Sequence, residues 1–237
     1  MNASATETHS TETHSTETRS ALLLGATGLV GAKLLERLLR DDAYSRVSVL
    51  SRRALPVQHD KLNVCVVDFD RLSDAPEQCS ADDVFCALGT TIAQAGSQAA
   101  FRKVDFDYPL QAASIALSQG AEQYFLVSAI GADARSAVFY SRVKGEIEEA
   151  IAALGYRAFA SFRPSFLLGK REQTRFGEEL GIALASVLKP LMLGPLAKYR
   201  AVSADAVAAA MIAEAKKREA GRRVIESDRI QEIFDRL

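Results

Sequence analysis

The stretch that most constrains this chain runs from Ala21 to Gly31 and reads Ala-Leu-Leu-Leu-Gly-Ala-Thr-Gly-Leu-Val-Gly. Its apolar half predicts a buried strand that ends at Gly25, where a helical pattern of leucines begins. Gly28 and Gly31 complete a G-x-x-G-x-x-G spacing in the turn between the two. A glycine-rich turn in this context is typical of a dinucleotide site, because the amides of the helix's first turn can hold phosphates.

Each of these glycines has a predicted role. Gly25 permits the tight turn, Gly28 lets the backbone approach a pyrophosphate, and Gly31 lets the helix pack closely on the strand. The other residues of this turn that are predicted to bind the cofactor are Thr27, Leu29 and Val30. The alternative is a tight strand–helix corner that binds no ligand.

Composition places the chain among ordinary globular proteins and narrows its partners. Of 237 residues, 48% are hydrophobic and 25% charged, and the net charge is −1. That balance gives no reason to expect a nucleic-acid partner, which requires a basic surface. The three cysteines show no C-x-x-C spacing, so we expect buried free thiols in a reducing compartment and no metal site.

Residues 1–20 are predicted to form a disordered tail, because most of them repeat Thr-Glu-Thr-His-Ser with little variation and few can be buried. Residues 21–237 are predicted to form a single domain, with 170–237 as a small C-terminal, substrate-side part. No segment approaches the ~20 apolar residues of a membrane span, and the N-terminus lacks the apolar region of a signal peptide. We therefore expect a cytoplasmic protein without a membrane span.

Strands and helices alternate along the chain, which predicts an α/β fold with a doubly wound, mostly parallel sheet. The favoured strand order is 3-2-1-4-5-6, and ligands of such sheets bind beyond the carboxyl ends of the strands. After the first strand, the predicted strands are Arg46–Ser51, Leu62–Asp68, Asp83–Leu88, Gln123–Ile130 and Ala158–Arg163. The predicted helices between the later strands are Gln98–Gln119 and Val138–Leu154.

A small C-terminal helical region is predicted to follow. Its expected elements are the helices Glu178–Leu188 and Ala204–Lys217, a short strand Arg222–Ile225, and a final helix that ends at Phe234. The apolar stretch Ile182–Leu196 is interrupted by a lysine and two prolines. We interpret it as a lid over the substrate side or as the subunit interface of a homo-oligomer, with a peripheral membrane contact as the alternative.

The second predicted strand ends in Ser51-Arg52-Arg53, where an NAD site normally carries an acidic residue for the ribose 2′-hydroxyl. Two guanidiniums instead suit a 2′-phosphate, which arginine can bind through paired, charge-assisted hydrogen bonds. The sequence therefore favours NADP(H) over NAD(H) as the cofactor. The alternative is two arginines on a solvated loop.

Two further strand ends contribute predicted cofactor contacts. Asp68 and Phe69 are placed to flank an adenine, one by a hydrogen bond and one by packing. Leu88, Gly89 and Thr90 lie at the end of the fourth strand, where the small residues of the stretch would let the cofactor's ribose lie against the backbone. Ordinary turns after strands are the alternative at both places.

Ser128, Tyr140 and Lys144 are the predicted catalytic residues. Tyr140 and Lys144 lie four apart on a predicted helix, hence on one face, and Ser128 ends the preceding strand. A phenol has a pKa of about 10, which a nearby ammonium lowers by favouring the phenolate. Such a tyrosine can protonate a carbonyl oxygen as hydride arrives. Lys144 can also reach the nicotinamide ribose, and Ser128 can hold the substrate oxygen.

Together these segments resemble an atypical short-chain dehydrogenase/reductase, nearest the Tat-interacting-protein-like oxidoreductases that are grouped with nucleoside-diphosphate-sugar epimerases. The segments that carry the resemblance are Gly25–Gly31, Ser51–Arg53, Asp68–Phe69, Leu88–Thr91, Val127–Ala132, Tyr140–Glu146 and Arg163–Ser165, with Val202–Met211 similar to the helix that follows. The resemblance implies a Rossmann-type fold, bound NADP(H), and Ser128, Tyr140 and Lys144 as the catalytic trio. It also implies that Pro164 and Ser165 lie near the nicotinamide.

The leading hypothesis is an NADP(H)-dependent oxidoreductase acting on a carbonyl or alcohol of a small-molecule substrate. A first alternative is a non-catalytic NADP(H)-binding regulatory or scaffold protein. A second is an epimerase or dehydratase of nucleotide sugars, which would share the fold and the trio but recycle a bound NAD.

Overall fold

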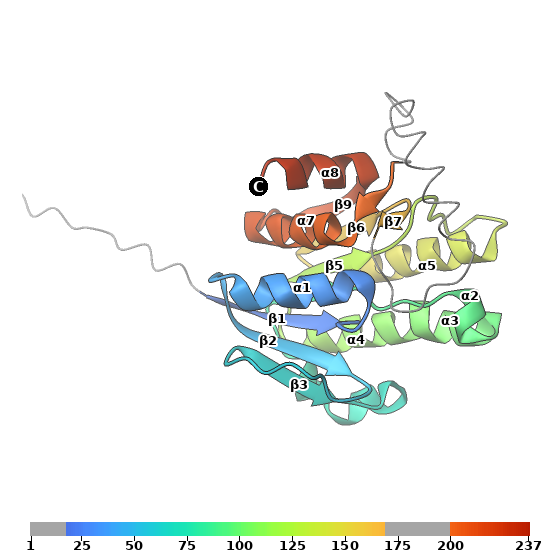
Figure 1. Ribbon diagram of the computed structural model, residues 1–237. Coiled ribbons are helices and arrows are strands. Elements are labelled where there is room, and N and C mark those ends of the chain that lie inside the picture. Colours follow the sequence, from blue (N-terminus) through green and yellow to red (C-terminus); the bar gives the residue numbers. More distant parts are fainter. Residues whose placement is uncertain (1–17, 169–199) are drawn as a thin grey trace, which may run out of the picture.

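The computed structural model describes residues 18–168 and 200–237, and its centre is a sheet of seven parallel strands (Figure 1). The strand order is β3-β2-β1-β4-β5-β6-β9, so the predicted order of the first six strands is confirmed. The strands are β1 (Arg19–Leu24), β2 (Tyr44–Ser51), β3 (Leu62–Val66), β4 (Asp83–Cys86), β5 (Gln123–Val127), β6 (Ala158–Arg163) and β9 (Gly221–Glu226). A separate pair consists of β7 (Leu167–Leu168) and β8 (Val202–Ser203).

Helices cover both faces of the sheet (Figure 1). One face carries α1 (Leu29–Arg40), α7 (Ala204–Lys217) and α8 (Ser227–Asp235), and the other carries α4 (Tyr108–Ser118) and α5 (Phe139–Ala153). Successive side chains of a strand point to opposite faces, so in β1 Leu23 packs on the α1 side while Leu22 and Leu24 pack on the α4 side. The apolar run of the first strand is explained by burial on both faces.

The described C-terminal residues belong to the same layers as the rest of the domain. The predicted helix Ala204–Lys217 is confirmed as α7, the predicted strand 222–225 lies within β9, and the final helix is α8. Strand β9 pairs with β6 and extends the main sheet. The predicted helix 178–188 and the predicted lid or interface 182–196 lie outside the described residues, as do residues 1–17 of the predicted tail. No helix in the described parts of the chain is long and apolar enough to cross a membrane.

Several predicted boundaries were wrong by a few residues. Strand β1 begins at Arg19, inside the predicted tail, because the backbone N–H and the hydroxyl of Ser20 bind Asp82 at 2.6 and 2.8 Å. Strands β3, β4 and β5 end two or three residues earlier than predicted. At these points the chain leaves the hydrogen-bonded ladder and forms the loops at the rim of the sheet. The last apolar residues of each predicted strand therefore belong to a loop.

The predicted helix Gln98–Gln119 is a continuous helical segment that is interrupted by a π-helical turn. It comprises α3 (Gln98–Arg102), a π-helical turn (Lys103–Asp107) and α4, preceded by the short helix α2 (Ile92–Ala95). Pro109 lies in the first turn of α4 and has no N–H to donate to the carbonyl of Asp105. The regular helical ladder cannot continue there, and π-helical turns of this kind are frequent at functional sites.

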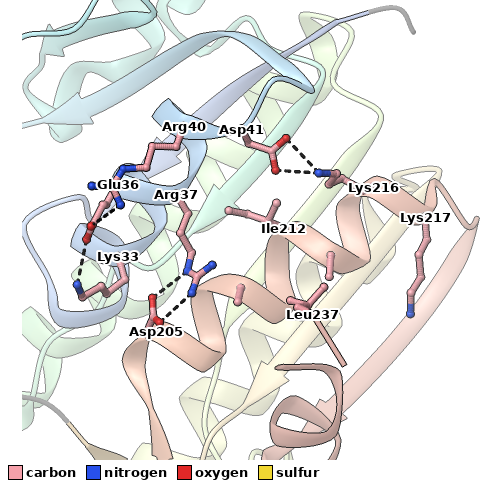
Figure 2. Close-up of a pocket in the computed structure, with 12 residues that line it drawn as sticks. Lys33, Glu36, Arg37, Arg40, Asp41, Asp205, Ile212, Lys216, Lys217 and Leu237 are labelled. Carbon is pink, nitrogen blue, oxygen red and sulfur yellow. Dashed lines mark hydrogen bonds and ion pairs between the residues drawn. The ribbon is translucent and has the colours of Figure 1, made fainter. Parts of the chain in front are cut away.

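Helices α1 and α7 pack against each other and are joined by ion pairs along a shallow hollow (Figure 2). Arg37 binds Asp205 through two hydrogen bonds of 2.8 Å, and Lys216 binds Asp41 at 2.9 Å. Alanine-rich α7 lets the helices approach closely. The hollow contains none of the predicted site residues.

A buried polar cluster ties the amino-terminal edge of the sheet together. Asp83 is fully buried and accepts hydrogen bonds from Arg19 at 2.8 and 3.0 Å. It also accepts from the hydroxyl of Tyr44 at 2.9 Å and from the amide of Gln123 at 2.7 Å. Burial, together with the neighbouring carboxylate, raises the pKa of Tyr44 far above its ordinary value. The cluster lies at the edge opposite the glycine turn, so we assign it to stability.

Replacing Asp83 with Ala should lower the free energy of unfolding by about 3–5 kcal/mol. The buried hydroxyl of Tyr44 loses its acceptor, and the Arg19 guanidinium and the Gln123 amide lose their buried carboxylate. Urea denaturation measures the change. Asp74→Ala is the control, since Asp74 pairs with Arg71 on the surface and should cost about 1 kcal/mol or less. Similar losses in both variants would contradict the assignment.

Candidate active site

The glycine turn depends on backbone contacts that leave no room for side chains. Gly25 has a φ of 85°, and a Cβ there would lie 2.5 Å from the carbonyl oxygen of Ala87. A Cβ on Gly31 would lie 1.9 Å from the carbonyl oxygen of Gly25. The tight turn and the close helix packing predicted for these two glycines are therefore present, and their contact with a cofactor stays a prediction.

The first turn of α1 has the properties of an anion site. Gly28 precedes the helix, donates its N–H to the carbonyl of Gly25 at 2.9 Å, and contributes no capping side chain. No acidic residue lies in the first turn, so nothing opposes the positive end of the helix dipole. Thr27 is exposed, whereas Val30 is buried and offers only its backbone.

At the end of β2, Ser51 accepts a 3.3 Å hydrogen bond from the backbone of Arg53. Arg52 and Arg53 are exposed, and neither side chain makes a hydrogen bond or ion pair with another residue in the described parts of the chain. Because β2 lies next to β1, these guanidiniums lie at the same edge as the glycine turn. They are free to bind an added anion.

Asp68 and Phe69 begin a 3-10 helix after β3. The Asp68 carboxylate is exposed and accepts a 3.0 Å hydrogen bond from the N–H of Asp70. The ring of Phe69 is buried against Tyr108, with centroids 5.2 Å apart. This burial leaves little of the ring for packing on an adenine, so the predicted adenine contact rests on Asp68 and the backbone.

The segment after β4 connects the glycine turn to the predicted catalytic lysine. Ala87 packs on Gly25, and two residues later a Cβ on Gly89 would lie 3.6 Å from Nζ of Lys144. Leu88 between them is half-buried. Thr90 donates its N–H to Asp105 at 2.9 Å. One short stretch of backbone therefore borders both halves of the candidate site.

The three predicted catalytic residues come from β5 and α5. Ser128 follows β5, is buried, and its hydroxyl has no hydrogen-bond partner among the described residues. Tyr140 lies in the first turn of α5, half-buried, with its ring 5.6 Å from that of Phe101. Lys144 lies one turn further along the same face. The electrostatic interaction of Lys144 with Tyr140 indicates that the two groups are close.

Lys144 forms a buried ion pair that the sequence analysis missed. Its Nζ lies 2.7 Å from Oδ1 of Asp105, in the π-helical turn, and both side chains are almost inaccessible to solvent. Burial alone would lower the pKa of Lys144, but Asp105, Tyr140 and Cys86 favour the ammonium and raise the pKa overall. The prediction of a lone ammonium beside Tyr140 is therefore incomplete. The available signal was weak, because Asp105 is one of two aspartates in this helical stretch.

The loop between β5 and α5 is fixed to the helix that carries Tyr140. A Cβ on Gly145 would lie 2.1 Å from the backbone nitrogen of Ala134, so loop and helix touch through backbone atoms. Arg142 donates to the carbonyls of Ser136 and Ala137 at 2.9 and 3.3 Å. These contacts hold the exit of β5, and with it Ser128, against α5.

Strand β6 ends at the same rim. Arg163 pairs with the buried Glu148 of α5 through hydrogen bonds of 2.9 and 2.7 Å, which raise the pKa of the guanidinium. Pro164 accepts a hydrogen bond from Ile130, two residues after Ser128. Ser165 donates its hydroxyl to the carbonyl of Arg200 at 2.6 Å. Pro164 therefore contacts the loop that follows Ser128. The contact of Pro164 and Ser165 with a nicotinamide stays a prediction.

The three cysteines are free thiols, as predicted. Burial raises the pKa of all three, that of Cys79 to about 11. No group of three or more histidine, cysteine, aspartate or glutamate side chains within 18–168 and 200–237 could hold a metal ion.

Comparison with known proteins shows the family and agrees with the fold. A family described as "NAD dependent epimerase/dehydratase family" matches residues 21–229. Protein HTATIP2 of Rattus norvegicus is 38% identical over 165 residues, which are 68% of this chain and 68% of that protein. Protein FMP52, mitochondrial, of Candida glabrata is 33% identical over 223 residues, which are 91% of this chain and 96% of the relative.

Two solved structures illustrate the similarity of fold. MoeE5 in complex with UDP-glucose and NAD superposes with a TM-score of 0.64 at 16% identity, covering 87% of this chain and 75% of that one. The UDP-N-acetylglucosamine 4-epimerase of Methanobrevibacter ruminantium M1 gives a TM-score of 0.66 at 12% identity, covering 92% and 81%. At this level of identity the likeness concerns the fold alone.

Gly31→Ala should greatly weaken dinucleotide binding, because the added Cβ would overlap the Gly25 carbonyl and force the turn to move. Binding is measured by the fluorescence of added NADPH and NADH. Ala32→Ser, at an exposed position on the same helix, is the control and should bind as the unaltered protein does. Unchanged binding in Gly31→Ala would contradict the placement of the site.

Proposed function

The chain belongs to the NAD dependent epimerase/dehydratase family, and from this premise we propose that it is an NADP(H)-dependent oxidoreductase that acts on a carbonyl or alcohol of a small molecule. The observation that carries the proposal is the continuity of the site. Backbone after β4 borders the glycine turn through Ala87 and the Lys144 ammonium through Gly89. A dinucleotide with its phosphates at the turn would extend along this backbone toward Lys144.

The preference for NADP(H) is supported by the two arginines after β2. A 2′-phosphate is a dianion, and Arg52 and Arg53 offer exposed guanidiniums with no other partner in the described parts of the chain. The glycine turn would hold the pyrophosphate, and Lys144 the nicotinamide ribose. When bound, the nicotinamide would supply or accept the hydride.

The chain's own residues would handle the proton and the substrate oxygen. Tyr140 would donate its phenolic proton to the carbonyl oxygen during reduction and take up the alcohol proton in the reverse direction. Ser128 would hold that oxygen by a hydrogen bond, a role supported by its buried hydroxyl without a partner among the described residues. The small size of the substrate stays a prediction. So does the cytoplasmic location, and the FMP52 relatives are named mitochondrial.

Turnover tests the proposal directly. NADPH and a panel of small aldehydes and ketones are mixed with the protein, and the nicotinamide absorbance is followed. Tyr140→Phe should lower kcat by about 10²–10⁴-fold, since it removes the proton donor. Tyr108→Phe removes a phenol that binds Asp70 on the surface and should leave turnover unchanged. Tight NADPH binding without turnover of any compound would favour the regulatory or scaffold alternative.

Replacing both arginines with alanine should weaken binding of NADPH far more than binding of NADH. The expected loss is about 1.5–3 kcal/mol for each charge-assisted contact. Dissociation constants for the two cofactors, measured by fluorescence titration, give the difference. Arg40→Ala at the far end of α1, where Arg40 pairs with Glu36, is the control. Equal weakening of both cofactors would overturn the 2′-phosphate assignment.

A further inference from the structure

Asp105 occupies the centre of the candidate site. It is 1% exposed, its Oδ1 lies 2.7 Å from Nζ of Lys144, and its Oδ2 accepts the N–H of Thr90 at 2.9 Å. A Cβ on Gly89 would approach Oδ1 to 3.1 Å. The carboxylate thus joins the lysine of α5 to the backbone segment along which the dinucleotide would lie.

The local backbone explains how a carboxylate comes to be there. The π-helical turn Lys103–Asp107 shifts the helical register by one residue just before Pro109. Asp105 is the buried residue of this turn, whereas Asp107 is exposed. Burying a charge is costly unless it is paired, and the pair with Lys144 together with the Thr90 hydrogen bond meets that requirement.

We propose that Asp105 is a positioning residue that acts on Tyr140 through Lys144, holding the ammonium beneath Gly89 and offsetting the positive charge that the phenol meets. This role rests on the proposed function, in which Tyr140 transfers the proton. A cation paired at 2.7 Å acts on its surroundings as a dipole, whose field falls off more steeply with distance than that of a lone charge. Asp105 therefore weakens the positive field that Lys144 exerts on its surroundings, Tyr140 included.

Three ionisable groups interact most strongly with Lys144. They are Asp105 from the π-helical turn, Tyr140 from the same helix and Cys86 from β4. Cys86 is a neutral thiol, because burial raises its pKa. Glu148, one turn further along α5, is occupied by Arg163. Asp105 is thus the carboxylate placed to compensate the lysine.

The first test removes both charges and follows ionisation of Tyr140. Ultraviolet absorbance is recorded during alkaline titration, and subtraction of the matching Tyr140→Phe protein isolates the signal of Tyr140. The double variant Asp105→Asn with Lys144→Met should shift the midpoint by less than about one pH unit, because a compensated pair is removed. If Asp105 does not offset the lysine, loss of the cation should raise the midpoint by about one to three units, which would overturn the proposal.

The second test uses Asp105→Asn alone. The ammonium then has no buried counter-ion, so the folded protein should lose a proton, from Lys144 or from Tyr140, at lower pH than the unfolded chain does. Fewer bound protons in the folded state mean that stability rises with pH. The denaturation midpoint of Asp105→Asn, relative to the unaltered protein, should increase between about pH 7 and about pH 9.

Asp107→Asn, in the same turn but exposed, is the matched control and should show no such relative increase. A flat difference for Asp105→Asn would overturn the proposal. If that variant does not fold at neutral pH, the double variant should fold, since no unpaired buried charge remains; failure of both to fold would also overturn it. Neither measurement needs substrate or cofactor, so absence of turnover would count against the proposed function alone.

Discussion

The arrangement of the domain depends on one backbone contact, between the glycine turn after β1 and the exit of β4. The missing side chains of Gly25 and Gly31 let three stretches of backbone meet: the end of β1, the start of α1 and Ala87. Because the strand order reverses direction between β1 and β4, this is the place where an open parallel sheet leaves a crevice for a ligand. The same contact fixes where the chain goes next, since Gly89 follows Ala87 and reaches Lys144. A few glycine positions, where no side chain fits, thus bring together residues that lie far apart in the sequence.

The two edges of the sheet differ in how far their polar side chains are paired within the chain. At the amino edge, the carboxylate of Asp83 has all its partners within the chain and nothing left to bind a ligand. At the carboxyl edge the partners are incomplete. The Ser128 hydroxyl has none among the described residues, and the side chains of Arg52 and Arg53 have none in the same parts of the chain. An unpaired buried hydroxyl costs stability, so the Ser128 hydroxyl, at the same edge as the two exposed guanidiniums, is what a site prepared for a ligand would show.

Much of this could be predicted from the sequence, for reasons that individual segments make plain. The run Ala21–Leu24 is apolar at every position because both faces of β1 are covered, and glycines at fixed spacing after it leave few alternatives to a strand–turn–helix. The features that could not be predicted are those that depend on tertiary contacts. Two of the predicted strands are too long, because Leu88 and Ile130 continue the apolar pattern after β4 and β5 have ended. The sequence does not reveal the π-helical turn, because Pro109 is also compatible with an ordinary helix start.

Asp105 shows most clearly where sequence reasoning ends. Asp105 and Asp107 lie two residues apart in one amphipathic stretch, and periodicity alone does not tell which is buried. The extra residue of the π-helical turn decides it, and that residue is stabilised by contacts with α5, which lies more than thirty positions away in the sequence. A Tyr-x-x-x-Lys pair in the sequence therefore predicts a positive charge near the phenol but not the electrostatic potential there. That potential also depends on whether a carboxylate compensates the charge of the lysine. In this chain the carboxylate comes from a different crossover connection of the sheet, the helical segment between β4 and β5.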